Sequence, residues 1–309
     1  MKDILLNYVM KVDAYAPTPS ASTAYIRKVL CVVKPLPEGD TGTITECTTK
    51  AEVQALTNSE CYRVLEAGMN SIFVLPTNSL DIADVLAATD KQFFTILIDN
   101  SFSSSDVEGL DTGSFAGVVG WTNDDRATAK AFGYLKNNVG FYDTAANNSR
   151  NMYHAFGKML SANNWKNQQY IEMPLSSGID TINMANLLFD DSISFVLTSN
   201  EYGNRLGLFA SNRRAIIAPY IYEELTLNLQ SKALQYISLN QPNYTAAEAS
   251  LLEDTLQTVI DRYIEEGYIE KGSITISLGN QQFVANAQVE VPEPKALWRI
   301  FATMRQGEI

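Results

Sequence analysis

The sequence predicts an α/β protein with a mostly parallel sheet covered by helices, a β-rich C-terminal region and extended terminal arms. Short, continuous apolar runs alternate with helical segments through most of the chain, which is typical of parallel strands buried on both faces. This alternation stops near residue 205. Two apolar-patterned segments around a turn signal then follow, and an isolated hairpin of this kind needs a larger sheet to be stable.

Three parts are expected along the chain: an N-terminal arm over residues 1–26, an α/β core domain over 27–205, and a helical and β-rich region with a terminal arm over 206–309. The arm has too few apolar residues to form a core, and Pro17 and Pro19 separate them from the body. We therefore expect residues 4–10 to lie on a neighbouring subunit as an added strand. The alternative is that the arm folds back on its own body.

From residue 71 onward, strands and helices of the core are expected mostly to alternate. The expected strands are residues 29–33, 42–47, 71–76, 93–98, 115–121, 139–142, 168–173 and 193–198. The expected helices are residues 58–69, 79–88, 124–135, 149–160 and 179–188, with a short one opened by a capping box at Thr49 and Glu52. Asn123 or Asp124 is expected to open the helix over 124–135.

The C-terminal region has its own pattern. Residues 206–210 and 215–218 read as short extended segments, and 220–239 reads as mostly helical. Thr245 and Glu248 form a second capping box before a long helix that ends near Gly267. Alternating apolar residues and the turn signal at residues 279–280 then predict a hairpin.

Composition limits the partners. The chain has 309 residues, 46% of them hydrophobic, and a net charge of −12 from 35 acidic and 23 basic residues. An acidic balance argues against nucleic acid or an anionic membrane as a direct partner. No apolar run is long enough to span a membrane, and Asp3, Asn7 and Lys11 interrupt any secretion signal.

Charge and cysteine usage add two expectations. Residues 37–130 carry 15 acidic and 5 basic side chains, whereas the first 35 residues carry 5 basic and 2 acidic ones. The basic N-terminal arm could bind the acidic body of the next subunit. Ordinary solvated surface explains this charge distribution equally well. Cys31, Cys47 and Cys61 lack metal-site spacing and indicate a reducing compartment, with Cys31 as a core residue.

Catalytic chemistry is hard to find in this sequence. His154 is its one histidine, and neither a G-x-S-x-G elbow nor a phosphate-binding P-loop occurs. The glycines of residues 113–120 fail the dinucleotide-binding spacing and indicate close backbone packing instead. Acidic pairs at residues 124–125 and 190–191 are expected to be solvated rather than to bind a divalent cation. We therefore expect no enzyme activity, no cofactor and no metal.

Several stretches of the chain resemble the tail sheath proteins of contractile bacteriophages and related injection machines. They are residues 138–143, 155–160, 165–174, 195–197, 206–209 and, most strongly, 256–269 followed by β-structure. The resemblance rests on the order and character of the elements. It implies a structural subunit that stacks as rings or a helix around a tube, with terminal arms that add strands to neighbouring subunits. The short chain implies a minimal sheath without large outer domains.

The resemblance also implies partners and a location. The partners are further copies of the chain, a tail tube protein, and baseplate and tail terminator proteins. The location is the virion tail, after assembly in the host cytoplasm. Together with the hairpin and arm patterns, it predicts inter-subunit contacts at Leu5, Tyr8, Val9, Ile274, Ile276, Phe283, Val289 and Val291.

Two alternatives stay open. One is another tail structural protein, such as a tube-associated or baseplate component. The other is a small-molecule-binding α/β protein or enzyme whose site lies at the carboxyl ends of the parallel strands. Its candidate residues follow strands and are Thr77, Asn78, Asn100, Ser101, Asn123 and Asp124.

Overall fold

The computed structural model describes residues 23–37, 39, 42–78, 93–108, 117–135, 137–144, 149–162, 171–174, 178–199, 203–211, 214–279 and 285–292. The arm proper, the helix expected over 79–88 and the end of the chain lie outside these residues. So does most of the strand expected over 168–173, of which the described part makes one bridge, between Glu172 and Arg205.

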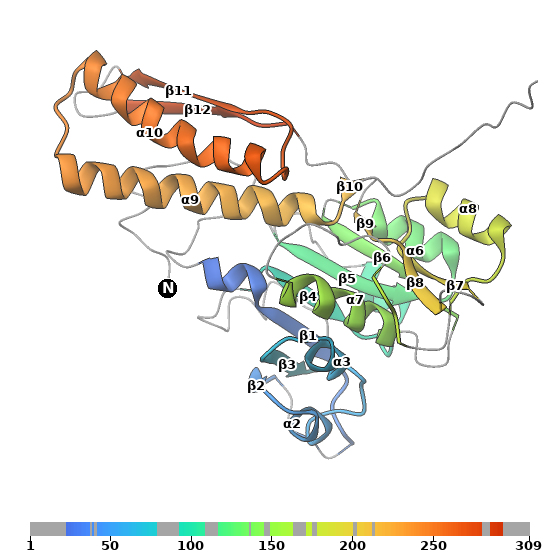
Figure 1. The fold of residues 1–309 in the computed structure, drawn as a ribbon. Helices are drawn as coiled ribbons and strands as arrows, with labels where there is room; N and C mark the ends of the chain where they lie inside the picture. Colours follow the sequence, from blue (N-terminus) through green and yellow to red (C-terminus); the bar gives the residue numbers. More distant parts are fainter. Residues whose placement is uncertain are drawn as a thin grey trace, which may run out of the picture.

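A six-stranded sheet forms the centre of the body, in the order β2-β3-β1-β4-β5-β6 (Figure 1). All neighbours pair in parallel except β2, which is antiparallel to β3. This confirms the predicted fold class. The strands are β1 (Val29–Val33), β2 (Thr45–Cys47), β3 (Ile72–Pro76), β4 (Thr95–Ile98), β5 (Val118–Asn123) and β6 (Asn138–Tyr142).

The sheet is buried on both faces because successive side chains of each strand point to opposite sides. In β1, Val29, Cys31 and Val33 join the larger hydrophobic cluster, whereas Leu30 and Val32 join a second one. The helices α3 (Arg63–Glu66) and α7 (Ser149–Ser161) contribute to the larger cluster. On the other face lie α5 (Ser104–Glu108) and α6 (Arg126–Gly133), whose Phe132 packs edge-on against Trp121.

Local signals set several helix ends. Thr49 and Glu52 form the predicted capping box of α2 (Lys50–Gln54). The expectation that Asn123 or Asp124 opens α6 is wrong, because Asp125 accepts the hydrogen bond from the backbone N–H of Thr128 at 2.8 Å. Gly120 confirms the expected close packing: a Cβ there would lie 2.9 Å from side-chain atoms of Leu97 and Phe156.

Beyond β6 the chain adds α8 (Ile182–Asp190) and the antiparallel pair β7 (Phe195–Ser199) and β8 (Gly203–Leu208). Ser194, just before β7, bridges to Phe141 of β6, so this pair continues from the sheet edge. The short strands β9 (Ala210–Ser211) and β10 (Arg214–Ala215) follow. β8 spans residues 205 and 206, where the sequence suggests a boundary.

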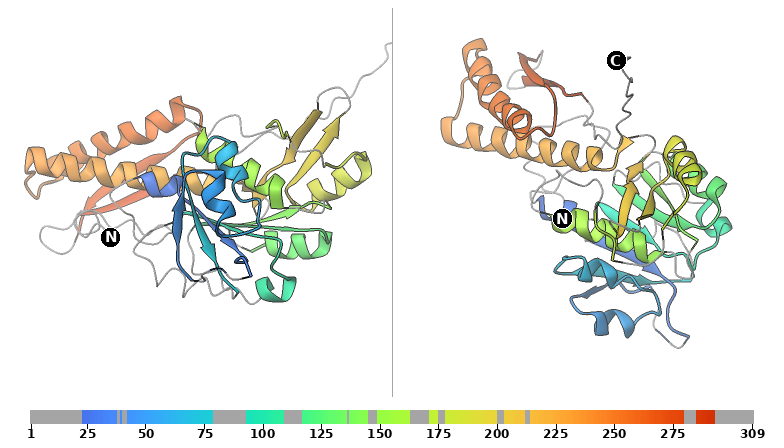
Figure 2. Two further views of the ribbon diagram at one scale, coloured as in Figure 1. Left: turned by 90° about the horizontal axis from the view of Figure 1, so that it is seen from below. Right: turned by 45° about the vertical axis from the view of Figure 1, so that its right-hand side comes forward.

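The last described elements form a projection that we call the lobe, Ile217 to Pro292. Two antiparallel helices, α9 (Ile217–Asn240) and α10 (Ala246–Glu265), lie beside the hairpin of β11 (Ser273–Leu278) and β12 (Ala285–Glu290) (Figures 1 and 2). The extended segment expected over 215–218 is wrong at residues 217 and 218, which already belong to α9. Gly267 has φ +71° directly after α10, as expected of a C′ residue.

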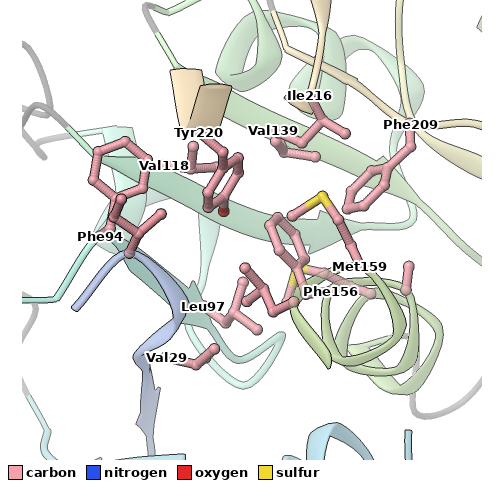
Figure 3. Packing of buried hydrophobic residues seen from close by; sticks show 14 of the residues in the cluster. Val29, Phe94, Leu97, Val118, Val139, Phe156, Met159, Phe209, Ile216 and Tyr220 are labelled. Carbon is pink, nitrogen blue, oxygen red and sulfur yellow. The ribbon is translucent and has the colours of Figure 1, made fainter. Parts of the chain in front are cut away.

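The start of α9 joins the lobe to the body. Tyr220 is fully buried, stacks edge-on against Phe94 at 5.1 Å between ring centroids, and shares a 2.7 Å hydrogen bond with Oγ1 of Thr95. Figure 3 shows Tyr220 over the sheet, in one layer with Phe156 and Phe209. The first turns of α9 are therefore part of the body's core, and the rest of the helix carries the lobe outward.

Candidate assembly surface

The C-terminal hairpin pairs in one continuous register. Ile274 lies opposite Val289 and Ile276 opposite Ala287, so these four side chains share one face. Ile274 is 3% exposed and belongs to the chain's own hydrophobic core, together with Ile260 of α10. Ile276 and Val289 are half-buried against that core. The hairpin is thus attached to α10 through one apolar face.

The two strands of the hairpin differ in exposure. In β11, Ile274 is buried and Ile276 is half-buried, while in β12 only Val289 is even half-buried. β12 is an edge strand with both faces largely open. Edge strands present unpaired backbone groups to other chains unless something covers them.

Side chains of α10 bond to the backbone of β11. The N–H of Ile274 donates to Oε1 of Gln257 at 3.1 Å, and the N–H of Ile276 donates to Oε2 of Glu253 at 2.6 Å. Nε2 of Gln257 also donates to the carbonyl oxygen of Gly272 at 3.2 Å and to Oδ1 of Asp261 at 2.8 Å. Glu253, Gln257 and Asp261 follow at four-residue spacing, which places them on one side of α10.

These bonds show which way the hairpin's backbone points. Opposite residues in an antiparallel pair alternate between pairs that exchange hydrogen bonds and pairs whose backbone groups point outward. Ile274 and Ile276 bond to α10, so their N–H groups point away from β12. The backbone N–H groups of their partners Val289 and Ala287 then point away from β11. Within the described part of the chain, nothing accepts from those two N–H groups.

A second feature is the root of the N-terminal arm, η1 (Thr23–Arg27). Ile26 is 1% exposed, and the hydroxyl of Tyr25 donates to Oε1 of Glu223 in α9. The guanidinium of Arg27 donates to the carbonyl oxygens of Leu160 and Ala162 at the end of α7, at 2.7 Å and 2.5 Å. The segment η1 is therefore attached to the body and to the lobe at once.

Large apolar side chains are exposed at both ends of the described molecule. Ile182 and Leu187 lie on α8, and Ile182 is 71% exposed. Leu239 at the end of α9 is 75% exposed, and Leu251 lies on the following helix. In Figure 1, α8 and the junction of α9 with α10 lie at opposite ends of the molecule. Isolated exposed apolar residues are common, but these two groups are available for contacts with other molecules.

The predicted contact residues fall into two groups. The structure brings Ile274, Ile276, Val289 and Val291 together at the hairpin, where all four pack toward the chain's own core. Leu5, Tyr8, Val9 and Phe283 lie outside the described residues. The contacts of these eight residues with a neighbouring subunit stay a prediction.

The residues expected at the carboxyl ends of the strands take part in backbone structure. The N–H of Thr77 donates to Val33, the carbonyl of Asn78 accepts from Lys34, and the N–H of Asn100 donates to Oγ of Ser149. The N–H of Ser101 donates to Asp99, and Asn123 accepts from the N–H of Asp125. Asp124 is exposed. They assemble no evident catalytic arrangement.

A buried polar group that sequence reasoning missed lies at the end of β4. The carboxylate of Asp99, 4% exposed, accepts hydrogen bonds from the hydroxyls of Ser59 at 2.5 Å and Tyr153 at 2.9 Å. Burial and the nearby carboxylate raise the pKa of Tyr153 well above its usual value. The network ties the segment before α3 to β4 and α7. The one available signal was an aspartate directly after an apolar strand.

His154 and the cysteines are packed into the body. His154 is 4% exposed, and burial, followed by the charge of Lys158, lowers its pKa. Burial raises the pKa of Cys47 to about 11 and that of Cys31 well above its usual value, so neither thiol is activated as a nucleophile. Among the described residues, no three His, Cys, Asp or Glu side chains gather as a metal site. None of the helices in that part of the chain combines the length and apolar character that a membrane crossing needs.

Comparison with known proteins finds similar structures but no similar sequences. Models of known families give no match, and curated proteins give none either. Solved structures match nearly end to end. A chain in the anti-feeding prophage baseplate has TM-score 0.65 and 11% identity, covering 97% of this chain and 98% of that one.

Two further matches are sheath assemblies in the contracted state. For the anti-feeding prophage helical sheath the TM-score is 0.63, with 12% identity and coverage of 96% of this chain and 98% of that one. For the sheath complex of the extracellular contractile injection system PVC the TM-score is 0.67, with 10% identity and 96% coverage of both chains. The present chain therefore has the fold of contractile sheath proteins, which confirms the predicted resemblance for the fold.

Proposed function

We propose that this protein is a structural subunit of a contractile tail sheath, which polymerises around a tube by adding strands between subunits. The observation that carries the proposal is the hairpin of the lobe: it is fixed to α10 by one apolar face and has a strand open to pairing. Strand addition supplies directional main-chain hydrogen bonds with little demand on side-chain identity. The shared fold with sheath proteins supports this use of the hairpin.

The arrangement of exposed apolar groups fits an open array. A contact between different surfaces of identical subunits gives a ring if the rotation closes and a helix if it does not. The groups on α8 and at the α9–α10 junction lie at opposite ends of the described molecule, so they are two different surfaces that such a contact could join. The hydrogen bonds of Tyr25 and Arg27 fix η1 to its own subunit. This attachment suits an N-terminal arm that joins subunits while their bodies move apart.

The further assignments follow from this role. The polymer would surround a tail tube protein and meet baseplate and terminator proteins at its ends. Its place would be the tail of a virion or a related injection machine, with assembly in the host cytoplasm. Its function would be mechanical, without turnover of a substrate.

Negative-stain electron microscopy of the concentrated chain tests the proposal. We expect tubes or stacked rings from the full chain and none from a chain that lacks residues 272–309. Near-ultraviolet circular dichroism of the truncated chain checks that the body stays folded. Polymers of normal length from the truncated chain would show that the hairpin is dispensable. Strong thermal stabilisation of a non-polymerising full chain by one metabolite would instead favour a ligand-binding protein.

A further inference from the structure

Glu223 lies where η1, the body and the lobe meet. It follows Tyr220, which is anchored in the body's core, by about one turn of α9. Glu223 is 4% exposed, and its Oε1 accepts a hydrogen bond from the hydroxyl of Tyr25 in η1. Within the described part of the chain, no other group bonds to this carboxyl. A single hydrogen bond to a buried carboxyl therefore joins η1 to the start of the lobe.

The segment η1 is held at two points that differ in chemistry. On the body side, the guanidinium of Arg27 donates to the carbonyl oxygens of Leu160 and Ala162. This attachment does not change with pH, because a guanidinium stays protonated in proteins and a carbonyl oxygen does not titrate. On the lobe side, Tyr25 donates to a carboxyl group, which does titrate. Only the attachment to the lobe can therefore respond to pH.

The elements that pack at this junction supply no cation to Glu223. Their titratable or charged groups are Tyr25, Arg27 and Lys28 at η1, Tyr220, Tyr222 and Glu224 on α9, His154 and Lys158 on α7, and Arg262, Tyr263 and Glu266 at the end of α10. Lys28 lies over the ring of Phe73, and Arg262 lies over the ring of Tyr263 and 3.9 Å from Glu266. None of these cations pairs with Glu223 among the described residues.

A buried carboxyl group without a cation keeps its proton to a higher pH than an exposed one, because burial disfavours the charged form. Burial accordingly raises the pKa of Glu223 from 4.5 to about 7. The neutral carboxyl suits this site, since it accepts from Tyr25 without placing an uncompensated charge between η1 and α9.

We infer that Tyr25 and Glu223 form a pH-sensitive latch, which fixes η1 to the lobe while Glu223 is neutral and loosens when Glu223 becomes charged. Arg27 keeps η1 on the body in both states. The inference rests on the proposed sheath function only for its consequence: in a sheath subunit, a loosened latch would let η1 follow the N-terminal arm when neighbouring subunits move apart. The latch itself is a property of the isolated chain.

The direction of the pH effect follows from where the proton is bound. With the latch closed, Glu223 has a pKa of about 7, whereas in an open form exposed to water it returns to 4.5. The closed form is therefore favoured fully below pH 4.5, and it loses this advantage as the pH rises to about 7. From about pH 5 to about pH 8, opening should become at least about tenfold more frequent.

Hydrogen exchange of the full chain before assembly measures this opening. The amide of Lys28 reports on η1, because its N–H donates to the carbonyl oxygen of Tyr25 at 3.0 Å. The amide of Ala129 in α6, which donates to the carbonyl oxygen of Asp125 at 3.0 Å, is the reference within the body. The protection factor of Lys28 relative to that of Ala129 should fall at least about tenfold from about pH 5 to about pH 8. A ratio that does not change with pH would overturn the inference.

Substitutions separate the latch from a general loss of stability. Glu223→Gln keeps an oxygen that accepts from Tyr25 but cannot titrate, so the ratio should become independent of pH. Glu224→Gln, the matched control one residue further on, should keep the pH dependence. Tyr25→Phe removes the one hydrogen-bond donor, so the Lys28 amide should lose protection at about pH 5 as well. A tenfold fall that persists in E223Q would assign the effect to another group and overturn the inference.

Infrared difference spectra between the unchanged chain and E223Q follow the proton itself. We expect the carbonyl-stretch band of a protonated carboxylic acid at about pH 5.5 and its loss by about pH 8.5. The absence of this band at about pH 5.5 would overturn the latch. If E223Q does not fold, the exchange ratio of the unchanged chain still decides. A full chain that never polymerises would contradict the sheath function, whereas the exchange ratio and the spectra would still confirm or overturn the latch.

Discussion

The body and the lobe differ in how their strands are covered. Every residue of β1, β3, β4 and β6 is buried. Helices cover both faces of the sheet, β1, β3 and β4 have a strand on each side, and Ser194 lies beside Phe141 of the last strand, β6. In the lobe, β12 is exposed at five of its six residues. The body is a finished core that supplies stability. Among the described residues, the outward N–H groups of Ala287 and Val289 in β12 have no acceptor, as expected of a strand that can pair with another molecule.

The largest effect should come from opening the body's core. Phe156 is fully buried and packs edge-on against Phe209 at 4.9 Å between ring centroids. Phe156→Ala should lower the free energy of unfolding by about 3–5 kcal/mol, measured by urea denaturation. Leu187→Ala on exposed α8 is the matched control, with an expected change within about 0.5 kcal/mol. Equal losses for both variants would erase the distinction between core and surface in the body.

An intermediate effect should separate the two strands of the hairpin. Ile274→Ala should cost about 2–4 kcal/mol, because its side chain fills the space between β11 and α10. Val289→Ala, directly opposite, should cost about 1 kcal/mol or less, because the side chain is half-exposed. Urea denaturation of both variants sharpens the comparison. A loss for Val289→Ala as large as for Ile274→Ala would mean that β12 is packed as closely as β11.

The smallest effect concerns the junction between body and lobe, and it depends on pH. Burial raises the pKa of Glu223 from 4.5 to about 7. The folded state therefore keeps a proton that the unfolded state loses, so stability is full below pH 4.5 and falls as the pH rises to about 7.

Glu223→Gln should remove this dependence while keeping an oxygen that accepts from Tyr25. At about pH 8 the variant should be more stable than the unchanged chain, by at most on the order of 3 kcal/mol. Urea midpoints at about pH 4 and about pH 8 measure the difference, with Asp254→Asn as an exposed control. A variant that loses stability as steeply with pH as the unchanged chain would show that Glu223 is not the group responsible.

Local sequence signals predict many of the elements and fewer of their ends. The capping box at Thr49 and Glu52 and the glycine after α10 act through neighbouring residues, so the sequence alone predicts these helix ends. The helix expected over 58–69 shrinks to α3 because Thr57 and Ser59 use their side chains elsewhere. Thr57 donates to Lys34 and accepts from Ser59, and Ser59 donates to Asp99. Such bonds compete with helix formation.

The early start of α9 has a similar explanation. Pro219 disfavours helical geometry in the residue before it, which predicts an extended segment there. Proline is tolerated in the first turn, however, because the N–H that it lacks has no partner within the helix. Packing of Ile216 and Tyr220 into the body's core stabilises the helical conformation of this segment.

For the candidate surface, the sequence by itself determined that the C-terminal region contains a hairpin with one apolar face, since alternation and turn residues are local properties. It also determined that the body is an α/β core, since buried strands need continuous apolar runs. Only the tertiary structure decided which strand of the hairpin is open. That depends on Gln257 and Glu253 reaching the backbone of β11 from a helix that is 15 or more residues away in sequence. No local pattern encodes such a contact, because it arises only when α10 packs against the hairpin.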